Sequence, residues 1–478
     1  MPYQLYINGE WRDGAKGKTV AIENPATRET VVDAAYGEVS DAVDAMDAAA
    51  AAFPAWRSMT AYARGEKLDA AARLIRERAD KIAEALTLEN GKPLWEAMGE
   101  TIGCAQWFEW FAEEGKRVYG RMVPSHFDSK RHWVIHQPVG VVVAINPWNF
   151  PINLMSRKLG GALAAGCTIV TRPATQTPLS TMLLFECLHD AGFPPGVVNL
   201  VTGSASQLTP AMMEHPAMRK LSFTGSTEVG KQLMEQAGAR ITKLSLELGG
   251  HAPLLVFPDV DLQKAAEQTV SGKFRNAGQS CIAPTRIYVH EDIFDDFADA
   301  IVAEVEKMKV GNGLDEGVIM GPLFDQSQLD NTIEFMDDAI AKGAKVLTGG
   351  KQLTGGEFDK GYYYSPTVIR DISPAMRLTC EEVFGPILPL IPFRSEAEAI
   401  AEANNTDYGL AAYVLTNDFG TAIRVSEALE FGVVGLNDAV PTVPQAPFGG
   451  WKESGIGREG GYEGIHAYME TKYISVGV

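Results

Sequence analysis

The sequence has 478 residues, more than the roughly 250–300 at which a single hydrophobic core stops growing, so we expect at least two domains. Hydrophobic residues make up 46% and charged residues 22%, which is ordinary for a globular protein. The formal net charge of −19 argues against nucleic acid or an anionic membrane surface as the main partner, because both require a basic face.

The sequence also predicts a cytoplasmic location. The opening segment MPYQLYINGEW has no basic stretch followed by an apolar one, so we expect no signal peptide. We expect no membrane-spanning segment either, because every apolar run is too short. The five cysteines are few, odd in number and scattered, which is typical of a reducing compartment.

The N-terminal part is predicted to be helical after a short β-like start. We expect Ser40 to cap a helix that continues to Ala52, and Thr60 to cap the next helix. A third helix is expected to begin at Asp80 and to end at Gly91, because glycine readily closes a helix C-terminus.

From Pro138 onward, strands alternate with helices. Residues 138–146 read PVGVVVAIN, the nearly continuous apolar run of a strand buried on both faces, and the helix that follows ends at Gly166. A second series of the same kind begins near Ala252. This alternation predicts a doubly wound α/β fold. Its strand-to-helix turns lack the G-x-G-x-x-G fingerprint, so that motif does not predict a dinucleotide site here.

Cys281 is the candidate nucleophile. It lies in KFRNAGQSCIAP, where a glycine and small polar residues suit an accessible loop. A buried, apolar thiol is the commoner state of a cysteine, and we expect it for Cys104, Cys167 and Cys187. Cys380 precedes two glutamates whose charge favours the protonated thiol, so we expect no catalytic role for it.

Glu247 and Asn149 each come at the end of a predicted strand. Glu247 lies in LSLELGGHAP and Asn149 in INPWNFP. Ligands of open α/β sheets bind at the carboxyl ends of strands, where a partly desolvated glutamate can act as a base and an amide can donate to an oxyanion. The alternatives are a surface carboxylate for Glu247 and a turn residue between prolines for Asn149.

Six short motifs occur in the order found in the aldehyde dehydrogenase superfamily, and the similarity covers essentially the whole chain. They are PWNFP, FTGSTEVG, LELGG, GQSC, EEVFGP and PFGGWKESGIGRE. Within that superfamily the chain most resembles the succinate-semialdehyde dehydrogenases, through SRKLGGALAAG and KFRNAGQSC. It is also similar to the α-ketoglutaric semialdehyde dehydrogenases, through ELGGHAP, KFRNAGQSCIAPTR and YGRMVP.

The resemblance implies an α/β fold with three parts. Residues 1–118 and 139–250 would form a Rossmann-type cofactor-binding domain, and residues 251–449 an α/β catalytic domain. Residues 119–138 and 450–478 would form a small β element that bridges subunits. A homodimer or homotetramer is therefore expected.

The resemblance also assigns roles to the candidate residues. Cys281 would attack the aldehyde, Asn149 would stabilise the oxyanion, and Glu247 would activate the water that hydrolyses the resulting thioester. No metal is expected. The residues expected to bind NAD or NADP are Trp148, Arg172, Thr175, Gly225, Ser226, Leu248, Glu382 and Phe384.

Arg157 and Arg275 predict an anionic substrate. Arg157 follows Asn149 by about two helical turns, so both can face one side, and guanidinium groups match carboxylates bidentately. A surface position is the usual alternative for arginine. The resemblance favours binding, since succinate-semialdehyde dehydrogenases hold the substrate carboxylate with arginines at both places. Phe150 and Thr442 are expected beside them.

The sequence departs from the succinate-semialdehyde dehydrogenases at two places. Ala283 stands where many of them have a second cysteine, so no redox disulfide is expected. The loop NDAVPTVPQAPFGG is proline-rich and more similar to the ketoglutaric group. The expected function is oxidation of succinic semialdehyde to succinate. The alternative is α-ketoglutaric semialdehyde or another carboxylated or sulfonated aldehyde.

Two other classes are less favoured. They are an acylating dehydrogenase, which passes its thioester to coenzyme A, and a non-catalytic structural protein. Glu247 argues against the first, and the set Cys281, Glu247 and Asn149 argues against the second. NADP is expected as a cofactor beside NAD, because neutral Thr175 stands where NAD-preferring relatives often have glutamate, and Arg172 adds a cation suited to phosphate.

Overall fold

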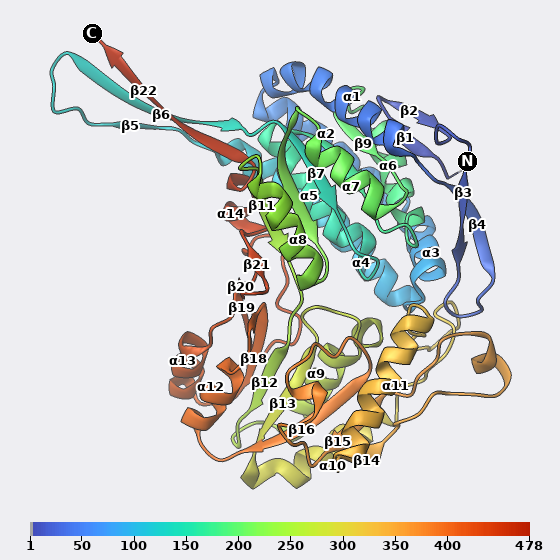
Figure 1. Ribbon diagram of the computed structural model, residues 1–478. Coiled ribbons are helices and arrows are strands. Elements are labelled where there is room, and N and C mark those ends of the chain that lie inside the picture. Colours follow the sequence, from blue (N-terminus) through green and yellow to red (C-terminus); the bar gives the residue numbers. More distant parts are fainter. Residues whose placement is uncertain (1–2) are drawn as a thin grey trace.

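The computed structural model describes residues 3–478, which form two large sheets and a projecting three-stranded arm (Figure 1). The first sheet has the strand order β2-β1-β9-β8-β7-β10-β11-β21, and its central strands from β9 to β11 are parallel. Its strands are β1 (Leu5–Ile7), β2 (Glu10–Arg12), β7 (Val141–Ile145), β8 (Thr168–Arg172), β9 (Val198–Leu200), β10 (Met218–Thr224), β11 (Lys243–Glu247) and β21 (Gly455–Ile456).

Helices cover both faces of this sheet. They are α1 (Val39–Ser58), α2 (Ala61–Glu77), α3 (Ala79–Asn90), α4 (Leu94–Glu114), α5 (Pro151–Ala165), α6 (Leu179–Asp190), α7 (Ala205–Glu214) and α8 (Thr227–Gly238). Val141 and Val143 of β7 pack in one core with α1 and α7, while Val142 and Ala144 pack in another with α2 to α6. Alternate side chains of one strand thus enter opposite cores, which is why its sequence is continuously apolar.

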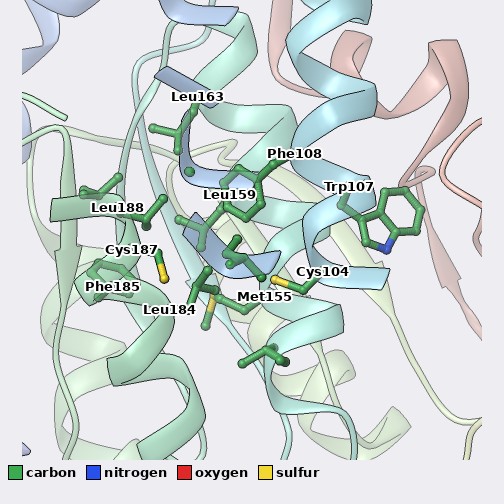
Figure 2. Close-up of a cluster of buried hydrophobic side chains, with 14 of the residues drawn as sticks. Cys104, Trp107, Phe108, Met155, Leu159, Leu163, Leu184, Phe185, Cys187 and Leu188 are labelled. Carbon is green, nitrogen blue, oxygen red and sulfur yellow. The ribbon is translucent and has the colours of Figure 1, made fainter. Parts of the chain in front are cut away.

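The larger core lies between α4, α5 and α6, as Figure 2 shows. Cys104 and Cys187 lie inside it among leucine and phenylalanine side chains, and Cys167 is buried as well. Burial raises the pKa of all three thiols. The predicted burial of these cysteines is confirmed, and it keeps them protonated and unreactive.

The second sheet has the order β14-β15-β16-β13-β12-β18-β19 and is parallel except for β14. Its strands are β12 (Ala252–Val256), β13 (Pro284–His290), β14 (Lys345–Thr348), β15 (Thr367–Arg370), β16 (Ile387–Phe393), β18 (Ala411–Leu415) and β19 (Val433–Leu436). The accompanying helices are α9 (Leu262–Phe274), α10 (Phe294–Val305), α11 (Gln326–Ala341), α12 (Glu396–Asn404) and α13 (Phe419–Ala428).

The arm extends away from the rest of the molecule (Figure 1). In it β22 (Met469–Gly477) pairs with β6 (Lys130–Pro138), which also pairs with β5 (Arg121–Val123). The other strands form two small sheets, β3 (Thr19–Glu23) with β4 (Thr30–Ala35) and β17 (Tyr408–Gly409) with β20 (Trp451–Lys452), and α14 (Gly461–His466) is a short α-helix before β22. The domain boundaries given above stay a prediction.

Most helix ends agree with the sequence signals. Thr60 accepts a hydrogen bond from the Ala63 amide, and Gly91 and Gly166 close their helices in the left-handed conformation. The prediction for Ser40 is wrong, because α1 already begins at Val39, and the Asp41 carboxylate accepts from the Glu38 amide. In the part of the chain described, no helix has both the length and the apolar character that crossing a bilayer needs.

Candidate active site

Three candidate residues come together at the carboxyl edge of the first sheet. Asn149 follows β7, Ser226 follows β10, and Glu247 is the last residue of β11. From β7 the chain adds β8 and β9 on one side, and later β10 and β11 on the other. The strand order therefore reverses between β7 and β10, which is where open α/β sheets bind their ligands.

Cys281 is held by a tightly constrained loop before β13. Asn276, Ala277 and Gly278 all have positive φ angles, between 50° and 75°, a conformation that costs energy for a residue with a Cβ. The Glu96 carboxylate accepts a hydrogen bond from the backbone N–H of Asn276 at 2.9 Å. A Cβ added at Gly278 would lie 2.2 Å from the Gly385 carbonyl oxygen, so this close approach requires glycine.

Cys281 is half-buried and lies between two cavities. One has a volume of about 170 Å³ and contains Phe150, Arg157, Arg275 and Thr442. The other has a volume of about 250 Å³, and its lining includes Trp148, Asn149, Gly225, Ser226, Leu248, Glu382 and Phe384. Cys281 lines both cavities, so a group in either one can meet its sulfur. The structure thus separates the predicted substrate residues from most predicted cofactor residues, with Cys281 between them.

The Cys281 thiol is protonated in this environment. Burial, together with the charges of Glu382 and Glu247, raises its pKa to about 12, although Arg157 opposes the shift. A thiolate is the reactive form, so an efficient attack requires a group that takes the proton.

The Asn149 side chain is buried beside the cysteine loop. Its Nδ2 donates a hydrogen bond to the Gln279 backbone carbonyl at 3.2 Å. The side-chain Nδ2 of Asn276 donates to the Asn149 backbone carbonyl at 3.0 Å. These contacts tie the strand end after β7 to the loop before β13. An amide at this place can donate to an oxyanion on a carbon bonded to the Cys281 sulfur.

Glu247 is buried next to the cavities and does not line either one. Within residues 3–478, neither of its carboxylate oxygens has a hydrogen-bond partner. Burial and the neighbouring Glu459 carboxylate raise its pKa well above 4.5, while Lys158, Arg157 and Arg458 oppose the shift. A carboxylate whose pKa is raised in this way is a stronger base than an ordinary glutamate once it is ionised.

Two arginines give the smaller cavity its charge. Arg157 is only 6% exposed, lies against the rings of Trp107 and Phe448, and donates from Nε to Asn153 Oδ1 at 3.2 Å. Its Nη1 is buried without a partner among the described residues. The Arg275 guanidinium lies 4.8 Å from the centre of the Phe150 ring. A cavity lined by two guanidinium groups suits an anion.

The residues that line the larger cavity suit the nicotinamide and pyrophosphate parts of a dinucleotide. Ser226 caps α8, whose N-terminus carries the partial positive charge and free amides that suit a pyrophosphate. The Trp148 and Phe384 rings offer apolar faces and meet edge to face at 5.6 Å. Glu382 accepts from the Gly250 amide at 3.0 Å, and burial raises its pKa to about 7. Its carboxylate can accept hydrogen bonds from ribose hydroxyls.

Arg172 and Thr175 lie together, but neither lines the larger cavity. The Arg172 guanidinium donates to the Gly203 carbonyl at 3.1 Å and to Thr175 Oγ1 at 3.4 Å, and Thr175 Oγ1 also donates to Gly203 at 2.9 Å. Burial lowers the pKa of Arg172 to about 10, so it remains a cation at neutral pH.

Sequence reasoning missed several residues of the site. Gln106 and Trp107 of α4 line the smaller cavity, and Gln328 lines the larger. The Lys158–Glu459 ion pair is buried next to Glu247. Helical spacing could have placed the α4 residues on one face, but nothing local links that face to Cys281.

Comparison with known proteins agrees with this geometry. Residues 11–474 match the model of the "Aldehyde dehydrogenase family". Glutarate-semialdehyde dehydrogenase of Pseudomonas putida and the NADP⁺ succinate-semialdehyde dehydrogenase of Escherichia coli are each 47% identical, over 99% of this chain and 98% of the relative. The solved structure of an NADP-dependent enzyme of E. coli superposes with a TM-score of 0.98 at 47% identity, covering 100% of this chain and 98% of that one. The chain therefore belongs to the aldehyde dehydrogenase family, and the predicted fold class and NAD(P)-dependent oxidoreductase class are confirmed with it.

Proposed function

We propose that this enzyme oxidises a short aldehyde with an anionic group at its far end, with succinic semialdehyde as the leading substrate. One observation carries the proposal: the cavity beside Cys281 holds two guanidinium groups, and no acidic residue is among the described residues that line it. Its volume of about 170 Å³ is below the roughly 300–1,000 Å³ of pockets for larger ligands, which favours a short substrate. The relatives named above act on semialdehydes that carry a carboxylate, which agrees with this reading.

In the proposed mechanism, the Cys281 thiol first loses its proton to water in the cavity, which passes it to solvent. The sulfur attacks the aldehyde carbon, and the Asn149 amide and the Cys281 backbone N–H stabilise the oxyanion. A nicotinamide held in the larger cavity, whose lining includes Trp148, Ser226, Glu382 and Phe384, would supply the hydride acceptor. Glu247 then takes a proton from the water that hydrolyses the thioester. Arg157 and Arg275 hold the anionic end throughout.

Replacing either arginine by methionine is expected to raise KM for succinic semialdehyde by roughly ten- to a hundredfold, because buried charge-assisted contacts contribute about 1.5–3 kcal/mol. Methionine fills more of the space than alanine would beside Trp107 and Phe448. Steady-state kinetics with succinic semialdehyde and uncharged butanal would measure the effect. Arg157→Met and Arg275→Met should change KM for butanal much less.

Lys307→Met is the control for the arginine variants, since this lysine lies in a neighbouring groove outside the site. It should leave both KM values unchanged. Equal losses for charged and uncharged aldehydes in the arginine variants would show that the arginines are structural, and the proposal would fail.

Introducing a carboxylate at position 175 is expected to reduce use of NADP selectively. In Thr175→Glu the new charge would lie beside Arg172 and repel a 2′-phosphate, so kcat/KM for NADP should fall more than tenfold, equivalent to about 1.4 kcal/mol. NAD should be spared. Thr175→Gln, of similar size and neutral, should change little. A wild-type enzyme strictly specific for NAD, or equal losses with both cofactors, would contradict the assignment.

The arm is proposed to join two copies of the chain in a homodimer or homotetramer. The outer edges of β5 and β22 are not paired within the described chain. Met122 on β5, Tyr473 on β22 and Trp133 on the central strand β6 expose between 43% and 73% of their surface. Exposed apolar side chains on an unpaired sheet edge are typical of surfaces that become covered on association.

A further inference from the structure

A fully buried ion pair lies behind the site and takes no part in the steps above. Lys92 follows α3, Glu100 belongs to α4, and their side chains are 0% exposed, with Nζ 2.5 Å from Oε2. Neither residue lines either cavity beside Cys281. A buried ion pair is poor evidence of stabilisation, because desolvation of both charges offsets their attraction. Its contacts indicate another purpose.

Lys92 holds the backbone of the oxyanion donor. Its Nζ donates to the Asn149 carbonyl oxygen at 2.8 Å, the same oxygen that the Asn276 side chain reaches. The Asn149 side chain meanwhile donates to Gln279. The backbone of Asn149 is thus held by the Lys92 ammonium group, and its side chain is held by Gln279 of the loop before Cys281.

Glu100 holds the start of the helix that carries Arg157. Its Oε1 accepts from the backbone N–H groups of Ile152 at 3.2 Å and Asn153 at 3.1 Å. These N–H groups lie in the first turn of α5, where they have no partner within the helix. Asn153 in turn accepts from Arg157 Nε, so the carboxylate supports the substrate cation one turn further along.

Lys92 of the buried ion pair and Arg275 of the smaller cavity both lie against the ring of Phe150. Lys92 Nζ lies 4.1 Å from the centre of its ring, and the Arg275 guanidinium lies 4.8 Å from the same centre. Both cations are attracted to the aromatic ring. The ion pair therefore has direct or one-step contacts with Asn149, Arg157 and Arg275.

We propose that Lys92 and Glu100 are positioning residues, which set the Asn149 amide for the oxyanion and the two arginines for the substrate. Neither touches a reacting atom. The proposal rests on the function proposed above. Oxyanion donors act only when they are fixed at the place where charge develops, so loosening the Asn149 backbone should slow hydride transfer itself.

Lys92→Met tests the pair because it removes the charge and keeps much of the volume. We expect the rate of the first hydride transfer to fall roughly ten- to a hundredfold. Removing an oxyanion donor outright typically lowers the rate roughly hundred- to thousandfold, so the expected loss is smaller. Stopped-flow absorbance, normalised to the amount of folded enzyme, measures this rate. KM for succinic semialdehyde should rise and cofactor Kd should stay within twofold. Lys220→Met is the matched control. Lys220 is 1% exposed, donates to Ser245 at 2.6 Å and lines neither cavity.

Glu100→Gln is the milder second variant, because its amide oxygen can still accept from Ile152 and Asn153 while the charge is lost. It should fold and show a smaller loss in the same step. The positioning role is overturned if either folded variant transfers hydride within twofold of the wild type, or if Lys220→Met loses as much. Failure of the proposed function would give a different result, because the wild-type enzyme would then oxidise butanal more efficiently than succinic semialdehyde. The hydride-transfer rates of wild type and variants would in that case be compared with butanal as the substrate.

Discussion

Replacing Cys281 by alanine is expected to abolish aldehyde oxidation while the protein stays folded and binds its cofactor. Cys281 lines both cavities and is the proposed nucleophile, so its loss should leave no group to form the thioester. Turnover should fall by more than roughly a thousandfold, since removing the nucleophile of a covalent mechanism can cost a millionfold. Steady-state assays measure the loss, and fluorescence titration with NADP measures cofactor binding.

Cys380→Ala is the matched control for the nucleophile. Cys380 is exposed and belongs to a different cavity, so its removal should leave turnover unchanged. Substantial activity in folded Cys281→Ala would refute the assignment of the nucleophile. A loss in Cys380→Ala equal to that in Cys281→Ala would equally contradict it.

Replacing Glu247 by glutamine is expected to separate the two halves of the reaction. If its main task is to activate water, the first burst of reduced cofactor should persist while steady-state turnover falls by roughly a hundredfold or more. Stopped-flow absorbance records both phases in one experiment. Equal loss of burst and turnover would instead assign Glu247 mainly to the deprotonation of Cys281, whose pKa is raised to about 12.

The pH profile gives an independent readout for Glu247. The base must be ionised to act, and burial beside Glu459 raises its pKa well above 4.5. Turnover should therefore decline as the pH falls through that raised pKa, at a higher pH than an ordinary glutamate would produce. The decline should be absent in Glu247→Gln. Persistence of the same acid limb in the variant would assign it to another group.

The main features of the fold could be predicted from the sequence because its signals are local. Strands buried on both faces leave continuous apolar runs, as in β7, and Gly91 and Gly166 mark helix ends that require a left-handed residue. Ser40 failed as a cap because cap signals overlap within one turn, and the Asp41 side chain serves a cap two residues earlier, at Glu38. Local patterns place an element well and its first residue poorly.

The site could be predicted only where short motifs mark it. Cys281 and Asn149 come from such motifs, and the structure brings them to the same cavity. The Lys158–Glu459 pair joins residues 301 positions apart, so no local pattern could reveal it. The Lys92–Glu100 pair spans only eight positions but looks like two ordinary charges on a helical segment. Burial of both partners, which only the packed structure establishes, makes these pairs distinctive.

The measurement that tests the central claim most directly is identification of the acyl-enzyme. Glu247→Gln, mixed with NADP and succinic semialdehyde and then denatured in acid, should carry one succinyl group as a hydroxylamine-sensitive thioester. Peptide mass spectrometry should place it on Cys281, and Cys281→Ala should carry none. A thioester on another cysteine, or no adduct despite a full burst of reduced cofactor, would contradict the account. So would more rapid acylation by butanal than by succinic semialdehyde.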